Sequence, residues 1–172
     1  TPADCVKVAL ARVMEERPDI VLSGINNGYN VGLDILYSGT VGVTMEALAN
    51  GIPAMAFSAD SCEDLRVADL YMEELIRELI KKEIKPYEVW NINFPSMEPD
   101  KIKGLLYDRK PSIYQYYQNR YTPTDLPCGG TELSLSSELR SFAEEGSDME
   151  AVLSGCISIG KLENALLRNA AL

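Results

Sequence analysis

The chain has 172 residues, of which 46% are hydrophobic and 24% charged, as is typical of one globular domain with or without an appendage. Its formal net charge of −10 disfavours a nucleic-acid polymer or a membrane surface as partner, because binding to either comes mainly from Lys and Arg. The absence of histidine and of any C-x-x-C pair excludes His-based triads and zinc fingers. The widely scattered cysteines favour reduced thiols in a cytoplasmic protein; they are Cys5, Cys62, Cys128 and Cys156.

A helix is predicted over residues 1–16, where apolar residues recur at helical spacing. Thr1 can cap it, Pro2 suits the first helical position, and Asp4 is favoured by the helix dipole. The sequence enters this helix at once and has no initial Met. We therefore expect a chain whose earlier residues are not represented.

The next elements alternate between strand and helix. An apolar run at 20–22 predicts a short strand buried on both faces of a parallel sheet, and it is the best candidate for a central strand. Helices over about 41–49 and 65–82 then alternate with strands over about 53–58 and 89–94. This order predicts a doubly wound, Rossmann-like α/β sheet.

The pattern changes after Pro99. A tyrosine-rich stretch at 105–121 predicts extended or hairpin structure, and a short helix, a brief strand at 156–159 and a terminal helix at 162–172 follow. We therefore divide the chain into an α/β core with the binding loop, residues 1–100, and an oligomerisation part, residues 101–172.

A loop rich in Gly and Asn follows the first predicted strand, from Ser23 to Gly32. Ligands of open α/β sheets bind beyond the carboxyl ends of the strands. The G-x-x-x-G-x-x-x-G spacing is neither a dinucleotide fingerprint nor a P-loop. Asn26, Asn27 and Asn30 offer amide oxygens to a hard cation. A plain surface turn is the alternative, and residue types alone favour it, because Gly and Asn both tolerate positive φ.

Ser38, Gly39 and Thr40 lead into the second predicted helix. The unpaired N–H groups and the dipole of a helix N-terminus form a natural anion site. Ordinary N-capping by Ser38 or Thr40 is the alternative, and for this segment alone it is the better one. Taken together, the Asn-rich loop and the helix start favour a metal and phosphate site at one edge of the sheet.

The stretch at 18–41 reads PDIVLSGINNGYNVGLDILYSGTV. It closely resembles the hallmark segment of the SurE phosphatases, also called survival protein E or 5'/3'-nucleotidases. Other segments of the chain are similar to that family as well, and 121–139 is the least similar stretch. The matching segments are TPADCV at 1–6, GIPAMAFS at 51–58, NINFP at 91–95, and Asp148 with GCISI at 155–159.

The resemblance implies a phosphatase that hydrolyses nucleoside monophosphates with water activated by Mg²⁺ or Mn²⁺. By position in the motif, Asn26 matches the metal-binding Asn, and the segment from Ser38 through Gly39 to Thr40 matches the lining of the anion pocket. The remaining metal ligands of the family, an Asp-Asp pair and a Ser, belong upstream of Thr1. No catalytic residue is therefore assigned within the sequence, and we expect little activity from these 172 residues alone.

The resemblance also implies a fold and an assembly. The expected fold is a SurE-like, mostly parallel sheet that lacks its first strands and carries a C-terminal hairpin and helix extension. Asn30 and Asp34 are expected to support the binding loop. A homodimer or homotetramer, joined by an exchanged hairpin and the helix at 162–172, is implied, with Arg109 and Arg120 near the neighbouring site.

The tyrosines of the predicted hairpin have two interpretations. Stacking on a nucleobase is one, and packing in the hairpin or between subunits is the one we favour, since Tyr is enriched at interfaces. They are Tyr114, Tyr116, Tyr117 and Tyr121.

Two other functions compete with the phosphatase. One is a non-catalytic nucleotide-binding or interaction module that keeps the anion loop. The other is an NAD-dependent oxidoreductase, which the missing G-x-G-x-x-G disfavours. In the favoured reading the partner is a small nucleotide, and neither a nucleic-acid polymer nor a membrane.

Overall fold

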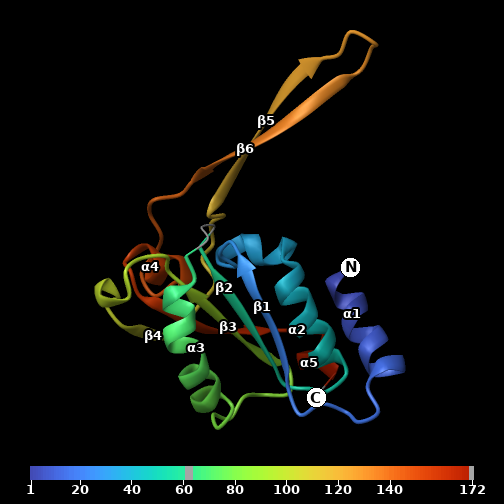
Figure 1. The fold of residues 1–172 in the computed structure, drawn as a ribbon, viewed down its shortest axis with the longest axis vertical. Coiled ribbons are helices and arrows are strands. Elements are labelled where there is room, and N and C mark those ends of the chain that lie inside the picture. The colour runs from blue at the N-terminus through green and yellow to red at the C-terminus, as the bar shows by residue number, and fades with distance from the viewer. Residues whose placement is uncertain (61–63, 171–172) are drawn as a thin grey trace.

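The computed structural model describes residues 1–60 and 64–170, so Cys62 and the last two residues of the predicted terminal helix lie outside the described residues. Five strands form one sheet in the order β1 (Val21–Asn27), β2 (Ala54–Ala59), β3 (Glu88–Phe94), β7 (Ile157–Glu163) and β4 (Leu105–Arg109) (Figure 1). The first three strands are parallel, β7 is antiparallel to β3, and β4 is parallel to β7. The predicted α/β class with a mostly parallel sheet is confirmed.

The helices are α1 (Pro2–Val8), α2 (Gly39–Ala49), α3 (Arg66–Leu79), α4 (Asp148–Leu153) and α5 (Ala165–Ala170), with a π-helical turn at Ala9–Val13 and 3-10 turns at Gly32–Tyr37 and Pro99–Lys101. α2 and α3 lie close to the predicted positions. α1 ends well before the predicted 16, and α5 begins later than the predicted 162, because Leu162 still pairs with Val89 as part of β7. The predicted start of α1 is confirmed: the Thr1 hydroxyl accepts from the Asp4 N–H, and the Asp4 carboxylate accepts from the Thr1 amino group. Within the described part of the chain, no helix is long and apolar enough to cross a membrane.

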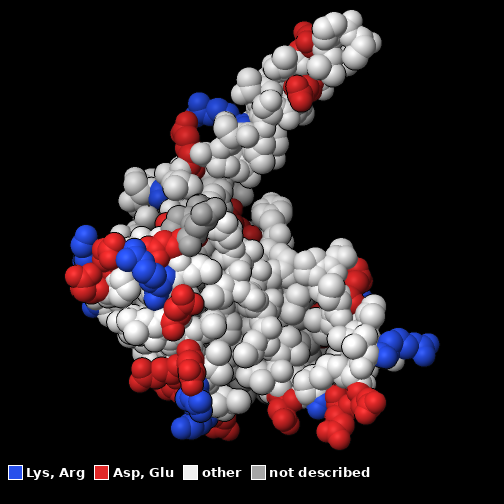
Figure 2. Space-filling model, viewed as in Figure 1, with Lys and Arg blue, Asp and Glu red and all other residues white. Residues whose placement is uncertain are grey.

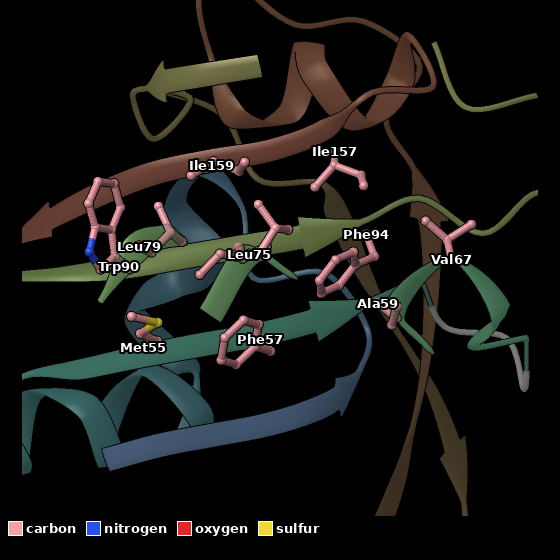
Figure 3. Close-up of a cluster of buried hydrophobic side chains, with 12 residues drawn as sticks. Met55, Phe57, Ala59, Val67, Leu75, Leu79, Trp90, Phe94, Ile157 and Ile159 are labelled. Carbon is pink, nitrogen blue, oxygen red and sulfur yellow. The ribbon is translucent and has the colours of Figure 1, made fainter. Parts of the chain in front are cut away.

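The two faces of the sheet are covered by different helices. Side chains of β2 and β3 alternate between the faces, so Met55 and Phe57 point toward α3 whereas Ala54 and Ala56 point toward α2 (Figure 3). The α3 side includes the large residues Trp90, Phe94, Leu75, Leu79, Ile157 and Ile159. The α1 and α2 side includes Val6, Val41, Leu48, Ile52, Val89 and Leu162. Coverage on both faces is what the predicted doubly wound arrangement requires.

Within the described residues, the first predicted strand is neither central nor buried on both faces. Among the described strands, β1 pairs with β2 alone and forms an edge of the sheet. The Leu22 side chain on it is 47% exposed. A run of three apolar residues has the same appearance in a central strand and in an edge strand, since only the neighbouring strands determine which it is. The strand also continues to Asn27, so part of the predicted loop is strand.

The tyrosine-rich stretch leads into a long two-stranded hairpin that projects from the body (Figure 1). Its strands are β5 (Tyr117–Asp125) and β6 (Thr131–Leu139), paired antiparallel over their whole length. The neighbouring strand β4 belongs to the main sheet instead, through its pairing with β7. The hairpin starts beside the carboxyl ends of β1 and β2, where its first residue, Tyr117, accepts a hydrogen bond from Tyr29 of the predicted binding loop (Figure 1).

Candidate functional site

The site begins where the parallel strands β1, β2 and β3 end. Asn26 lies near the end of β1, next to Ser58 of β2 in the strand register. Its side-chain Nδ2 donates to the Gly28 carbonyl oxygen at 2.7 Å. That bond fixes the amide plane and leaves the Oδ1 oxygen as the group that can ligate or accept.

Asn30 is held by a buried cluster of polar side chains beneath the loop, and it is only 4% exposed. Its N–H donates to Asn93 Oδ1 at 2.9 Å, and its Nδ2 donates to Ser58 Oγ at 2.6 Å. Its carbonyl oxygen accepts from Asn91 Nδ2 at 2.9 Å and from Asn93 Nδ2 at 3.2 Å. Buried amides are stable only when they are paired in this way. The loop is thereby fastened to the sheet.

Asp34 fastens the base of the hairpin to the same loop. Its carboxylate accepts from the Tyr116 N–H at 2.7 Å and from the Tyr117 N–H at 3.0 Å. In return, the Tyr117 hydroxyl accepts from the Tyr29 N–H at 2.9 Å. Because these contacts join residues more than 80 positions apart, the loop and the hairpin base form a single wall.

Asp148, at the start of α4, holds the far end of the loop. Its carboxylate accepts from the N–H groups of Gly32 at 3.0 Å, Ser112 at 2.9 Å and Met149 at 2.7 Å. Burial raises the pKa of this carboxyl to about 6, although the three N–H donors act in the opposite direction. Gly32 has φ +55°, and a Cβ there would lie 2.1 Å from the Tyr114 carbonyl oxygen, so only glycine fits.

Ser38 caps α2, since its Oγ accepts from the Val41 N–H at 3.1 Å. This is ordinary N-capping, and it is compatible with binding of an anion by the backbone N–H groups of the same helix start. Gly39 and Thr40 are the first residues of the helix, where backbone N–H groups have no partner within the helix. These N–H groups and the positive end of the helix dipole favour an anion at this point.

One pocket of about 410 Å³ brings most of the predicted residues together. Asn26, Asn30, Asp34, Ser38 and Gly39 all line it, whereas Thr40 does not. The base of the hairpin forms the rest of the wall, with Tyr37 from the neighbouring 3-10 turn; the hairpin residues are Tyr117, Asn119 and Ser137.

A larger groove of about 710 Å³ lies on the other side of the 3-10 turn. Its lining is mainly apolar, with Leu33, Leu36 and Met45 among its residues; Lys110 and Lys161 also line it, but Asn26 does not. The smaller pocket is the one that combines Asn26 with the start of α2, so it is the candidate for a metal and phosphate site.

The described residues meet only part of the requirement of a metal ion. Asn26 offers one neutral oxygen, whereas Mg²⁺ and Mn²⁺ are bound chiefly through carboxylates. In residues 1–60 and 64–170, no group of three or more His, Cys, Asp or Glu side chains is arranged to hold a metal. The donor set in this pocket is therefore incomplete, and Asn26 fits as one ligand among others.

Comparison with known proteins shows the family of the chain. A family model described as survival protein SurE matches residues 1–116. The 5'-nucleotidase SurE of Heliobacterium modesticaldum is 37% identical over 162 residues, which are 92% of this chain and 59% of that protein. The 5'-nucleotidase SurE of Aquifex aeolicus is 36% identical, over 94% of this chain and 65% of that protein. The chain belongs to the SurE family.

A solved structure of the same family has a similar fold. The crystal structure of SurE protein from Aquifex aeolicus matches all of this chain with a TM-score of 0.78 at 33% identity, and the match covers 71% of that structure. The expected SurE-like fold is thus confirmed. The SurE chain described here spans about half to two thirds of the length of the curated relatives it matches.

Several residues of the site were not predicted from the sequence. Ser58, Asn91 and Asn93 hold Asn30, and the alternation of the two Asn residues on one face of a buried strand was the available signal. Ser137 lies in the stretch least similar to the family and Asn119 just before it, and no signal in the sequence pointed to the pocket from either residue.

The predicted tyrosines are divided between packing and the pocket. Tyr116 is buried against Tyr29, with ring centroids 5.4 Å apart, and Tyr114 packs edge-on against Phe142. Tyr117 lines the pocket, while Tyr121 is exposed further along the hairpin.

Proposed function

We propose that this SurE chain forms the phosphate-binding side of a divalent-metal-dependent nucleotidase, which hydrolyses nucleoside monophosphates. The observation that supports it most directly is the shared pocket. It places the Asn26 side chain and the start of α2, at Ser38 and Gly39, against one space of about 410 Å³. A metal ligand and an anion-binding helix end beside each other suit a phosphate monoester.

A bound Mg²⁺ or Mn²⁺ ion would supply polarisation of a phosphoryl oxygen and an activated water. In this proposal Asn26 contributes one oxygen ligand, and the carboxylate ligands lie outside these 172 residues. That placement is supported by the lack of a metal-binding acidic cluster among the described residues.

The chain's own residues bind and orient the substrate. The N–H groups at the start of α2 hold the phosphate and stabilise the charge that develops on its oxygens. Asn30 and Asp34 act as positioning residues: their hydrogen bonds set the positions of the loop and of the hairpin base. The described residues therefore contribute binding and positioning, and no nucleophile or proton donor is assigned among them.

Release of phosphate from a nucleoside monophosphate with Mn²⁺ tests this proposal. We expect the full-length gene product to turn over and the 172-residue chain alone to be at least about a hundredfold slower, since mutation of a metal site commonly costs about tenfold to a hundredfold. In the full-length protein, Asn26→Ala should reduce kcat/KM at least about tenfold, whereas Asn169→Ala on α5 should not. Comparable turnover by the short and the long protein would contradict the placement of the carboxylates.

The alternative is a nucleotide-binding module without catalysis. The incomplete donor set for a metal is the observation that favours it. The same assay separates the two, because a module would bind a nucleoside monophosphate in the full-length protein but would release no phosphate.

We also propose a homodimer or homotetramer in which a second copy covers part of the hairpin. The hairpin is a mostly uncharged arm that stands clear of the body (Figure 2). Its apolar side chains Tyr121, Leu133, Leu135 and Leu139 are between 53% and 63% exposed. Apolar surface gathered in this way typically marks a contact with another protein. Arg120 pairs with Glu138 within the hairpin at 2.9 Å, so its approach to a neighbouring site stays a prediction, as does that of Arg109.

A further inference from the structure

The two faces of the hairpin differ sharply in chemistry. Side chains alternate along each strand, so every second residue of β5 and its partner on β6 share a face. On one face every cross-strand pair contains a polar or charged side chain: Gln118 with Glu138, Arg120 with Ser136, Thr122 with Ser134, and Thr124 with Glu132. On the other face lie Tyr117 with Leu139, Tyr121 with Leu135, and Pro123 with Leu133.

Two polar pairs share that face, Asp125 with Thr131 at the tip and Asn119 with Ser137 near the base, and only the second lies between apolar pairs. Asn119 and Ser137 are register partners one step from the base of the hairpin, and Ser137 Oγ donates to Asn119 Oδ1 at 2.7 Å. This pair lines the pocket that contains Asn26 and the start of α2. The polar interruption thus lies where the apolar face meets the candidate site.

The pair is held in place relative to the phosphate-binding wall. Asp34 binds the backbone of Tyr117, and the Tyr117 hydroxyl binds the backbone of Tyr29, so the first step of the hairpin is fastened to the loop. The Asn119–Ser137 pair is the next step along the same face. Its position therefore follows from the fold of the site itself, even though most of the hairpin is exposed.

The hydrogen-bonding groups of the pair suit hydroxyls. Since the Ser137 proton is directed to Asn119 Oδ1, the Asn119 Nδ2 group remains a donor and the Ser137 oxygen remains an acceptor. Among the described residues, the structure gives Asn119 Nδ2 no acceptor. A hydroxyl donates and accepts at once, so neighbouring hydroxyls on a sugar complement a donor placed beside an acceptor.

We infer that the Asn119–Ser137 pair binds the sugar hydroxyls of a nucleotide whose phosphate lies at the start of α2, an inference that rests on the proposed function of the same pocket. In a nucleoside monophosphate the sugar is the group next to the phosphate. The pocket volume of about 410 Å³ lies within the range of small-molecule sites and exceeds the needs of a phosphate ion alone. The pair is thus a specificity-determining contact and takes no part in the chemical step.

The test is a titration of the ¹⁵N-labelled 172-residue chain in the presence of Mg²⁺, in which binding is monitored through the amide chemical shifts. The probes are inorganic phosphate, adenosine 5'-monophosphate and its 2',3'-dideoxy analogue, which lacks both sugar hydroxyls. We expect phosphate to shift the amides of Gly39 and Val41. We expect the full nucleotide to bind about fivefold to tenfold more tightly than the dideoxy analogue, as the loss of two hydrogen bonds predicts.

Substitutions on the two faces of the hairpin provide matched controls. Asn119→Ala and Ser137→Ala should each reduce the preference for the hydroxylated nucleotide to about twofold to threefold, and the double substitution to about onefold, while phosphate binding is unchanged. Gln118→Ala and Ser136→Ala, the adjacent residues on the opposite face, should leave the preference intact. All four side chains are exposed, so none of the substitutions removes a buried contact.

The outcomes separate this inference from the function on which it rests. If phosphate shifts the α2 amides but the unsubstituted chain binds both nucleotides equally, the inference is overturned and the anion pocket stands. An unchanged preference in Asn119→Ala and Ser137→Ala also overturns it. If phosphate causes no shift at the start of α2, the anion pocket is wrong and the inference fails with it.

Discussion

Asp148 gives the most direct test of how the site is held together. It is 3% exposed, and its carboxylate is the acceptor for three backbone N–H groups, those of Gly32, Ser112 and Met149. Asp148→Ala leaves those buried N–H groups without an acceptor. Each such loss costs about 1–3 kcal/mol, so we expect the free energy of unfolding to fall by roughly 3–5 kcal/mol. Asp148→Asn keeps one acceptor oxygen and should cost less.

The same residue predicts a specific dependence on pH. Burial raises the pKa of Asp148 from 3.8 to about 6, so the folded chain holds this proton more tightly than the unfolded chain. The protonated carboxyl therefore adds stability below about pH 4, and this contribution is lost as the pH rises through about 6. A difference of about two pH units corresponds to roughly 3 kcal/mol.

Urea unfolding at about pH 4 and at about pH 7 measures this effect. Other carboxylates of a protein also change protonation over this range, so the comparison is between the parent and Asp148→Asn at each pH. The stability of the parent relative to the variant should fall by roughly 3 kcal/mol from the lower to the higher pH. A relative stability that stays constant would refute the reasoning, and so would an Asp148→Ala protein as stable as the parent.

Further predictions concern the loop and the hairpin. Asp34→Ala removes the acceptor of two backbone N–H groups at the hairpin base and should lower the free energy of unfolding by about 1–3 kcal/mol, measured in urea. Gly32→Ala should destabilise by more than about 2 kcal/mol because its Cβ has no room, whereas Gly42→Ala, in open space within α2, should be neutral or stabilising by up to about 1 kcal/mol in the same assay. Leu135→Glu on the apolar hairpin face should shift the light-scattering mass toward the monomer, and Ser134→Glu on the polar face should not; equal masses for both would contradict assembly through that face.

The sequence predicted most of the core, because strong local patterns coincide there with the fold. The cap of α1 depends on Thr1 and Asp4, which are three positions apart, so it can be predicted from the local sequence alone. The strand at 54–59 is an apolar run after a turn and is fully buried as predicted, and the alternating segment predicted at 89–94 forms the strand at 88–94. The SurE motif located the pocket, since Asn26 and Ser38 come together through the ends of neighbouring elements.

Contacts between residues that are far apart in the chain could not be predicted from the sequence. The position of β1 at the edge depends on which strands lie beside it, and the apolar run carries no such information. The partners of Asp148 and Asn30 lie up to 116 positions away, so no local spacing identifies them. The hairpin wall of the pocket was missed for the same reason, because Asn119 and Ser137 are ordinary surface residues until the fold brings them to the loop.

The turn at the tip of the hairpin fixes which residues reach the pocket. The Leu126 N–H donates to the Gly130 carbonyl oxygen there, and Gly129 and Gly130 have φ of +86° and +95°. In a hairpin the turn sets the strand register, and a slip of one residue moves each affected side chain to the opposite face. Such a slip in β6 would turn Ser137 away from the pocket and bring a neighbour such as Glu138 in its place. An insertion or deletion at the tip, far from any ligand, would therefore alter the recognition surface as surely as a substitution within it.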